Sequence, residues 1–149
     1  MTKLDDALQG VQQLGLDTAP VIYFIETNPK YDALVTEIFR RISRGVLEGL
    51  CSVITLTEVL VQPLRQRDQQ LAQDYSDLLL NSRHFATVSI DPVTATTAAD
   101  LRARYALRTP DALQVAAAMQ GGCQAFLTKD TTLRLVTAIR VLVLDELEL

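Results

Sequence analysis

The chain has few of the residues that build structural metal sites or disulfide frameworks. Its 149 residues include two cysteines and a single histidine, His84, and there is no Cys-x-x-Cys pair. Structural zinc is normally held by four Cys or His ligands, so the composition argues against such a site. Cys51 and Cys123 stand alone beside apolar segments, which favours buried free thiols in a reducing compartment over a disulfide.

The chain also lacks a long apolar run and an excess of positive charge. No stretch approaches the roughly 20 apolar residues that cross a bilayer. The first six residues carry acids and no continuous apolar core, so they are not a secretory signal. We therefore expect a cytoplasmic protein without a membrane segment. The net charge of −4 and the pI near 4.9 argue against indiscriminate nucleic-acid binding, but they leave a nucleic-acid enzyme possible.

What the chain does have is an alternation of short apolar strands and amphipathic helices. The expected strands cover residues 11–16, 51–54, 87–90, 125–128 and 140–144. The main expected helices cover residues 31–47, 55–66, 68–81, 91–105 and 109–121. Strands that are apolar on both faces are typical of a parallel sheet between two helical layers. The pattern predicts one domain, a three-layer α/β/α sandwich on a mostly parallel sheet of four to five strands.

Four acidic residues fall where the expected elements change direction. They are Asp17, Glu58, Asp111 and Asp130. Two end strands and two lie in the first turns of helices, so a parallel sheet would bring them to the edge where ligands bind. Carboxylates gathered without a basic residue repel one another unless a cation lies between them, and Mg²⁺ or Mn²⁺ prefers such hard oxygen ligands. Asp91 and Asp145 also follow strands, and spacing alone does not reject them.

Each of the four acids, taken alone, also has an ordinary structural explanation. Residues 55–58, Thr-Leu-Thr-Glu, have the form of a capping box that would use Glu58. Asp111 would gain from the helix dipole as the second residue of its helix. Asp130 suits the cap of a short helix over residues 131–137, and Asp17 suits a turn. Only the four together favour a metal site.

The segments around these acids resemble the motifs of PIN domains. Residues 16–26, Leu-Asp-Thr-Ala-Pro-Val-Ile-Tyr-Phe-Ile-Glu, resemble the opening motif, and residues 54–59, Ile-Thr-Leu-Thr-Glu-Val, resemble the second acidic motif. Residues 109–118, Thr-Pro-Asp-Ala-Leu-Gln-Val-Ala-Ala-Ala, are similar to the third and most specific motif, and residues 126–130, Phe-Leu-Thr-Lys-Asp, to the fourth. Order and spacing match from about residue 14 to residue 144, and residues 1–13 form an N-terminal extension.

The resemblance is to the VapC-like toxins of type II toxin–antitoxin pairs in particular. It implies a quasi-Rossmann fold, usually a homodimer, and a Mg²⁺-dependent ribonuclease with RNA as substrate and an antitoxin as partner. It also implies that the four acids bind the metal and catalyse hydrolysis, with one ion or two left open. Thr18 and Thr128 are candidate hydrogen-bond donors to the metal ligands. The candidate contacts to the RNA backbone are Arg40, Arg41, Arg44 and Lys129.

Two residues beside the acids depart from the family pattern. Ala19 stands where the family often has Asn, and Lys129 stands where it commonly has Asn. Neither change removes an acid. The lysine is expected either to weaken cation binding or to contact a substrate phosphate.

Other functions compete with the ribonuclease hypothesis. A PIN-like binding module without catalysis is one, although four retained acids argue against it. A Mg²⁺-dependent phosphatase of the haloacid-dehalogenase type is another, but it needs Asp-x-Asp after the first strand, where this chain has Ala19. A receiver-type signalling domain needs paired acids before its first helix and is weaker still.

Overall fold

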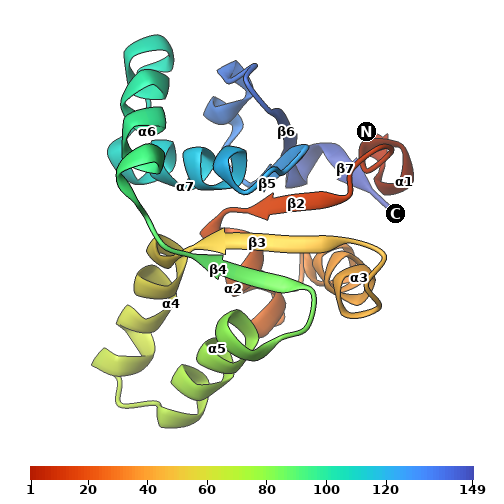
Figure 1. Ribbon diagram of the computed structural model, residues 1–149. Helices are drawn as coiled ribbons and strands as arrows, with labels where there is room; N and C mark the ends of the chain where they lie inside the picture. Colours follow the sequence, from red (N-terminus) through yellow and green to blue (C-terminus); the bar gives the residue numbers. More distant parts are fainter.

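The centre of the computed structural model, which describes residues 1–149, is a five-stranded sheet in the order β4-β3-β2-β5-β6 (Figure 1). The strands are β2 (Gln13–Leu16), β3 (Glu48–Ser52), β4 (Phe85–Val88), β5 (Ala125–Thr128) and β6 (Arg140–Val143). Every neighbouring pair is parallel, which confirms the predicted sheet. The chain builds outward from β2 to β4 and then returns to the other side of β2, and such a reversal is where open α/β sheets bind ligands.

Helices cover both faces of the sheet, which confirms the three-layer sandwich (Figure 1). One face carries α6 (Pro92–Tyr105) and α7 (Thr109–Gln120), and the short helix η1 (Thr131–Leu135) joins their apolar cluster. The other face carries α2 (Thr18–Ile25), α3 (Asp32–Ser43), α4 (Val53–Arg65) and α5 (Gln69–Asn81). The apolar core is accordingly split into clusters of 22 and 13 buried residues. None of the helices combines the length and hydropathy needed to span a bilayer.

Helix α7 packs unusually close to the sheet because its inner face is built from small residues. Ala112, Ala116 and Ala118 are fully buried. A Cβ atom added to Gly15 of β2 would lie 2.5 Å from the Cβ of Ala118, so only glycine fits there. This close approach brings the first turn of α7 to the end of β2.

The two ends of the chain meet in a small second sheet that the sequence did not predict. Strand β1 (Thr2–Lys3) pairs in parallel with β7 (Leu147–Glu148), which follows the short helix η2 (Leu144–Glu146), and α1 (Leu4–Ala7) lies beside them (Figure 1). The Arg140 guanidinium donates hydrogen bonds to the carbonyl oxygens of Ala7 and Gln9 at 3.1 and 3.0 Å. Two-residue strands carry no periodic pattern, so such pairing leaves no signal in the sequence.

Several element boundaries differ from the prediction, and one difference matters for function. The second strand, expected over residues 51–54, is β3 and ends at Ser52. The Ser52 hydroxyl accepts a hydrogen bond from the Ile54 amide at 3.1 Å and caps α4, which therefore begins at Val53. The capping box predicted for Glu58 is wrong, because Glu58 is the sixth residue of α4 and lies beyond its first turn.

Candidate functional site

The four acids lie around one open pocket at the carboxyl edge of the sheet. The pocket has a volume of about 480 Å³. Its lining contains the four acids, both residues that depart from the family pattern, and four further side chains: Asp17, Thr18, Ala19, Ile22, Glu58, Arg108, Asp111, Lys129, Asp130 and Thr131. We call it the acidic pocket. The topology therefore gathers acids that are up to 113 positions apart in the chain, from residue 17 to residue 130.

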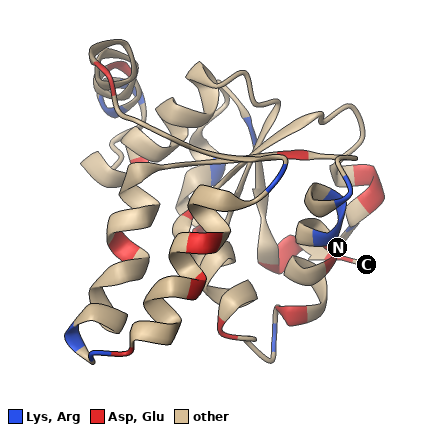
Figure 2. Cartoon of the chain, turned by 60° about the horizontal axis from the view of Figure 1, so that its bottom comes forward, with Lys and Arg blue, Asp and Glu red and all other residues tan.

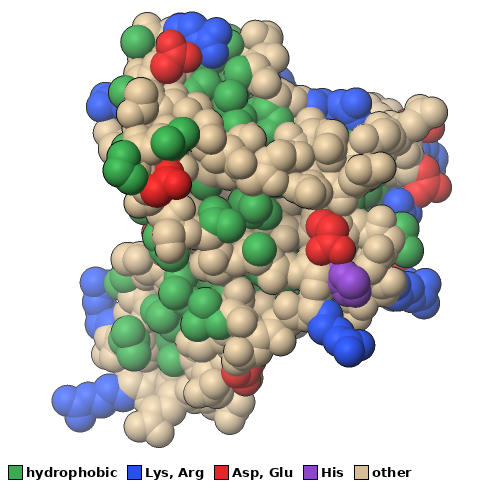
Figure 3. Space-filling model, viewed as in Figure 1, with side chains coloured by type: hydrophobic (Ala, Val, Ile, Leu, Met, Phe, Trp, Pro, Cys, Tyr) green, Lys and Arg blue, Asp and Glu red, His purple; other side chains and the backbone are tan.

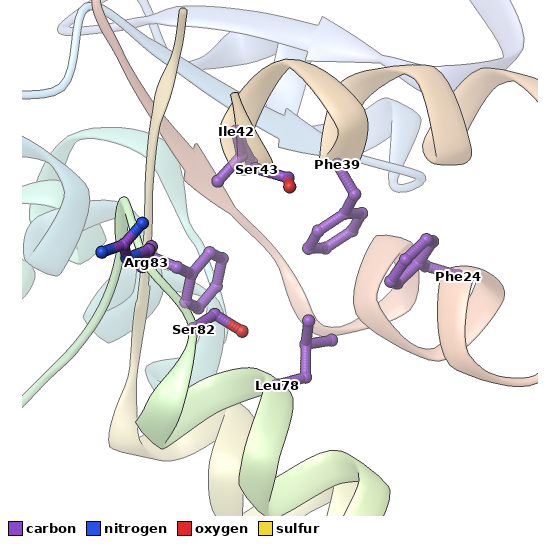
Figure 4. Close-up of a pocket in the computed structure, with 8 residues that line it drawn as sticks. Phe24, Phe39, Ile42, Ser43, Leu78, Ser82 and Arg83 are labelled. Carbon is purple, nitrogen blue, oxygen red and sulfur yellow. The ribbon is translucent and has the colours of Figure 1, made fainter. Parts of the chain in front are cut away.

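A second hollow is apolar and differs in chemistry (Figure 4). Phe24, Phe39 and Leu78 reach into it from α2, α3 and α5, and its volume is about 360 Å³. Phe24 and Phe39 are stacked with their ring centroids 4.2 Å apart. Its polar lining consists of two serines and Arg83, with no carboxylate. This hollow therefore offers no carboxylate that could hold a cation.

Asp17 is partly buried, and hydrogen bonds hold both of its oxygens. Oδ2 accepts a hydrogen bond from the Thr128 hydroxyl at 2.7 Å, and Oδ1 accepts one from the Thr18 amide at 2.9 Å as the cap of α2. Burial raises the pKa of this carboxyl above its ordinary value, and the charges of Asp111 and Glu58 raise it further, against the two hydrogen bonds. The structure thus gives Asp17 a capping role in place of the expected turn. It also places Asp17 near enough to Asp111 and Glu58 for their charges to act on it.

Glu58 is held by residues from two other elements. Its Oε1 accepts a hydrogen bond from the Thr18 hydroxyl at 3.0 Å and a longer one from the Gln114 amide at 3.5 Å. Thr18 therefore contacts a neighbouring acid through its side chain, while Thr128 contacts Asp17. Both threonines lie where the sequence suggested donors to the metal ligands.

Gln114 connects the acids, and the sequence reasoning missed it. Its side chain is 3% exposed. Its Nε2 donates to the Thr18 hydroxyl at 2.9 Å and to Asp17 Oδ1 at 3.3 Å. Its Oε1 accepts hydrogen bonds from the hydroxyls of Ser52 at 2.8 Å and Thr55 at 3.0 Å. Only its spacing pointed to it, because Gln114 lies one turn after Asp111 in an Ala-rich helix that also contains Gln120.

Asp111 lies at the third position of α7 and is paired with a basic residue. Arg108 occupies the N-cap position of α7, so Thr109 is already helical and the expected threonine cap is wrong. Arg108 Nε lies 3.0 Å from Asp111 Oδ2, and the Asp111 side chain is 16% exposed against 79% for Arg108. The expectation that no basic residue stands among the acids is therefore also wrong.

Asp130 and Lys129 follow β5 with different orientations. Asp130 caps η1 by accepting hydrogen bonds from the Thr132 amide at 2.9 Å and hydroxyl at 2.7 Å, as its structural explanation predicted. The Lys129 ammonium lies 6.0 Å from the ring centroid of Tyr23 and 5.8 Å from that of Tyr31. Cation–π attraction thus holds the lysine over two stacked tyrosines at the rim of the pocket.

The other two acids that follow strands, Asp91 and Asp145, make their contacts outside the acidic pocket. Asp91 caps α6 by accepting the Thr94 amide at 2.8 Å. Asp145 accepts the Tyr31 hydroxyl at 2.6 Å and pairs with Lys30 at 3.1 Å. Neither lines the acidic pocket.

The predicted arginine cluster is separated from the acidic pocket by the length of the sheet. Arg40, Arg41 and Arg44 lie at the C-terminal end of α3, which leads into the start of β3 at the opposite edge (Figure 1). Arg40 pairs with Glu37 at 2.7 Å, and Arg41 pairs with Asp5 at 2.6 Å. Figure 2 shows acidic and basic residues interspersed over the helices and turns. The structure does not bring this cluster to the acids.

The chemistry of the pocket fits a hard divalent cation. As the side chains stand, no three Asp, Glu, His or Cys residues are grouped closely enough to hold a metal ion. The donors are nevertheless carboxylate oxygens, which Mg²⁺ and Mn²⁺ prefer. Both Asp111 and Glu58 raise the pKa of Asp17, so their charges crowd one another and a cation would relieve that crowding.

Comparison with known families identifies a match over most of the chain. A family model described as "PIN domain" matches residues 15–139. No curated protein sequence matches the chain.

Solved structures share the fold at low sequence identity. A chain of VapBC2 from Rickettsia felis, bound to a promoter DNA fragment, superposes with a TM-score of 0.70 and 13% identity over 88% of this chain and 98% of that chain. A toxin–antitoxin complex from Klebsiella pneumoniae gives a TM-score of 0.66 and 18% identity over 89% and 97%. FitAcB from Neisseria gonorrhoeae gives a TM-score of 0.65 and 18% identity over 89% of this chain and 97% of that chain.

Proposed function

Because the chain belongs to the PIN-domain family, a family of nucleases, we propose that it is a Mg²⁺- or Mn²⁺-dependent endoribonuclease. The observation that carries this proposal is the meeting of Asp17, Glu58, Asp111 and Asp130 around one open pocket. The pocket is open to solvent, and its position at the carboxyl edge is where α/β sheets bind ligands. The reaction is hydrolysis of an RNA phosphodiester.

In this proposal the metal is held chiefly by Asp17 and Asp111, while Glu58 and Asp130 complete the site or orient the attacking water. When bound, the ion supplies positive charge to a phosphoryl oxygen and lowers the pKa of a water molecule. The remaining work belongs to side chains already in place. Thr128 keeps Asp17 Oδ2 in one orientation, so this ligand needs no reorganisation.

We propose Lys129 as the contact to the RNA backbone at the rim of the pocket. Its ammonium lies over the rings of Tyr23 and Tyr31 and forms no ion pair with an acid of the pocket, so it is available to an incoming phosphate. The cluster of Arg40, Arg41 and Arg44 has no part in this proposal, because it lies at the other edge of the sheet.

We propose further that the protein is the toxin of a type II toxin–antitoxin pair and acts in the cytoplasm. Structural neighbours described as toxin–antitoxin complexes support an antitoxin partner. The free cysteines, Cys51 and Cys123, suit a reducing compartment. Co-purification with the product of an adjacent gene, and loss of RNA cleavage in that complex, would test the pairing. An unchanged cleavage rate in the complex would count against it.

We propose that the whole chain is one domain and forms a homodimer. Leu4, Ala7 and Val11 of the N-terminal extension belong to the same apolar cluster as the central strands, which supports a single domain. Val61 and Leu64 on α4 and Val93 on α6 are exposed, and apolar side chains gather over these helices at the left of Figure 3. Light scattering would test the homodimer: the parent chain should be a dimer and Leu64→Asp a monomer.

The nuclease proposal is tested by a matched pair of substitutions. Asp17→Asn keeps a side chain that caps α2 but removes a metal ligand, so Mg²⁺-dependent cleavage of single-stranded RNA should fall by at least about 100-fold. Asp91→Asn makes the same change at a helix cap outside the pocket and should leave cleavage unchanged. Full activity of clean Asp17→Asn would sink the assignment. Protein that binds an antitoxin but neither binds Mn²⁺ nor cleaves RNA would favour the binding-module alternative.

A further inference from the structure

Arg108 is the basic side chain that the structure fixes onto an acid of the pocket. Its Nε and Nη2 donate to the two carboxylate oxygens of Asp111 at 3.0 and 3.4 Å, a forked contact. The hydrogen bond and the charge of Asp111 raise the pKa of Arg108, and the charges of Asp130 and Glu58 add to this effect. Lys129, the other cation at the pocket, is held over tyrosine rings instead.

The fold itself gains little from this arginine. Arg108 stands at the N-cap of α7, where its side chain makes no capping hydrogen bond. A positive charge at that end of a helix is opposed by the helix dipole. The side chain is 79% exposed, and ion pairs so accessible to water contribute little to stability. Most of the Arg108 side chain is already in solvent, so leaving Asp111 would expose little additional surface.

We propose that Arg108 is an exchangeable counter-cation and a substrate-positioning residue of the acidic pocket. It neutralises Asp111 while no metal is bound, releases Asp111 to an incoming divalent cation, and then contacts a phosphate of the RNA strand. The same planar fork that fits a carboxylate fits a phosphate, so the exchange needs no new geometry from the side chain. This inference rests on the proposed nuclease function.

The exchange predicts that removing Arg108 improves metal binding. Arg108→Ala removes a group that competes for Asp111, so Mn²⁺ alone should bind about 2- to 5-fold more tightly, as measured by calorimetry. Arg108→Lys keeps the positive charge but loses the forked donor geometry. Its affinity for Mn²⁺ should lie between those of the parent chain and Arg108→Ala. Arg104→Ala is the matched control, because Arg104 pairs with Asp100 on α6 at 3.2 Å and does not line the pocket. The control should bind Mn²⁺ like the parent chain.

The positioning role predicts the opposite effect on RNA. In Mg²⁺-dependent cleavage of a single-stranded RNA, Arg108→Ala should raise KM by about 10-fold, the loss of one charge-assisted hydrogen bond, with a smaller change in kcat. Arg104→Ala should leave both constants unchanged. A side chain that only stabilised the start of α7 would not improve metal binding while it weakened substrate binding.

The outcomes separate this inference from the nuclease proposal. Unchanged or weaker Mn²⁺ binding by folded Arg108→Ala overturns the exchange, and an unchanged KM overturns the positioning role, while the nuclease proposal stands. A parent chain that binds Mn²⁺ but cleaves no RNA overturns the nuclease proposal and the positioning role with it. In that case tighter Mn²⁺ binding by Arg108→Ala still supports the exchange. A parent chain that binds no Mn²⁺ overturns both proposals.

Discussion

Replacement of Gln114 by leucine should destabilise the protein more than any single surface change. Leucine has nearly the volume of glutamine, so the substitution leaves no large cavity and isolates the loss of hydrogen bonds. The hydroxyls of Ser52 and Thr55 lose the acceptor that now lies 2.8 and 3.0 Å away. Ser52 is 1% exposed and Thr55 is fully buried, so water cannot replace that acceptor.

The expected cost follows from these two buried donors. A buried donor left without a partner costs about 1–3 kcal/mol, so two of them should cost about 2–6 kcal/mol. The lower part of that range is favoured because Thr55 keeps its contact with the Thr18 hydroxyl at 3.0 Å. A loss of this size is a large fraction of the roughly 5–15 kcal/mol that stabilises a typical domain.

Urea unfolding at equilibrium measures this loss as a lower midpoint at an unchanged slope. The matched control is Gln120→Leu on the same helix, because the exposed Gln120 amide donates to Thr97 at 2.9 Å and both groups have access to water. The control should change the unfolding free energy by less than about 0.5 kcal/mol. If Gln114→Leu were no more costly than Gln120→Leu, the buried network would not contribute to stability and the reasoning would be refuted.

Three further predictions concern other parts of the molecule. Burial raises the pKa of the Cys51 and Cys123 thiols to about 11, so an alkylating reagent at pH 8 should label neither until urea unfolds the chain; rapid labelling of the native protein would contradict this. Gly15→Ala should lower the unfolding free energy by about 1–3 kcal/mol in a urea titration, because its Cβ would collide with Ala118. Asp91→Ala should lower the melting temperature by removing the cap of α6, whereas Asp91→Asn should nearly preserve it, and equal losses would argue against capping.

Most of the fold could be predicted because its determinants are local and repeated. The apolar strands and the helix starts after Asp91 and near Pro110 can be recognised within a few residues of sequence. The start of α4 could not, because residues 51–56 are apolar and hydroxyl-bearing throughout and suit a strand as well as a helix. The pairing of β3 with β2 over Glu48–Leu50 and with β4 as far as Ser52 places the strand before the helix.

The site shows the same division between local and long-range causes. The order of strands and helices narrowed the candidates to six acids, because parallel strands bring their carboxyl ends to one edge. The resemblance to the PIN motifs then separated the four from Asp91 and Asp145. The partners of those acids could not be predicted, since Gln114 and Arg108 acquire their roles only when α7 lies against β2. That approach depends on Gly15 and Ala118, two small residues about a hundred positions apart whose importance appears only in contact.

Because α4 begins at Val53 and not at the predicted Thr55, the structural explanation for Glu58 is lost while those for other acids remain. Asp17 and Asp130 cap helices as well as line the pocket, so a structural explanation covers part of their presence. Glu58 does not cap a helix. It lies beyond the first turn of α4, whose unpaired amides are on its N-terminal side. Its hydrogen bonds come from Thr18 and Gln114 on other elements, which hold it toward the pocket. A carboxylate that other elements hold at the pocket, and that its own helix does not need as a cap, is what the proposed cation site leads us to expect.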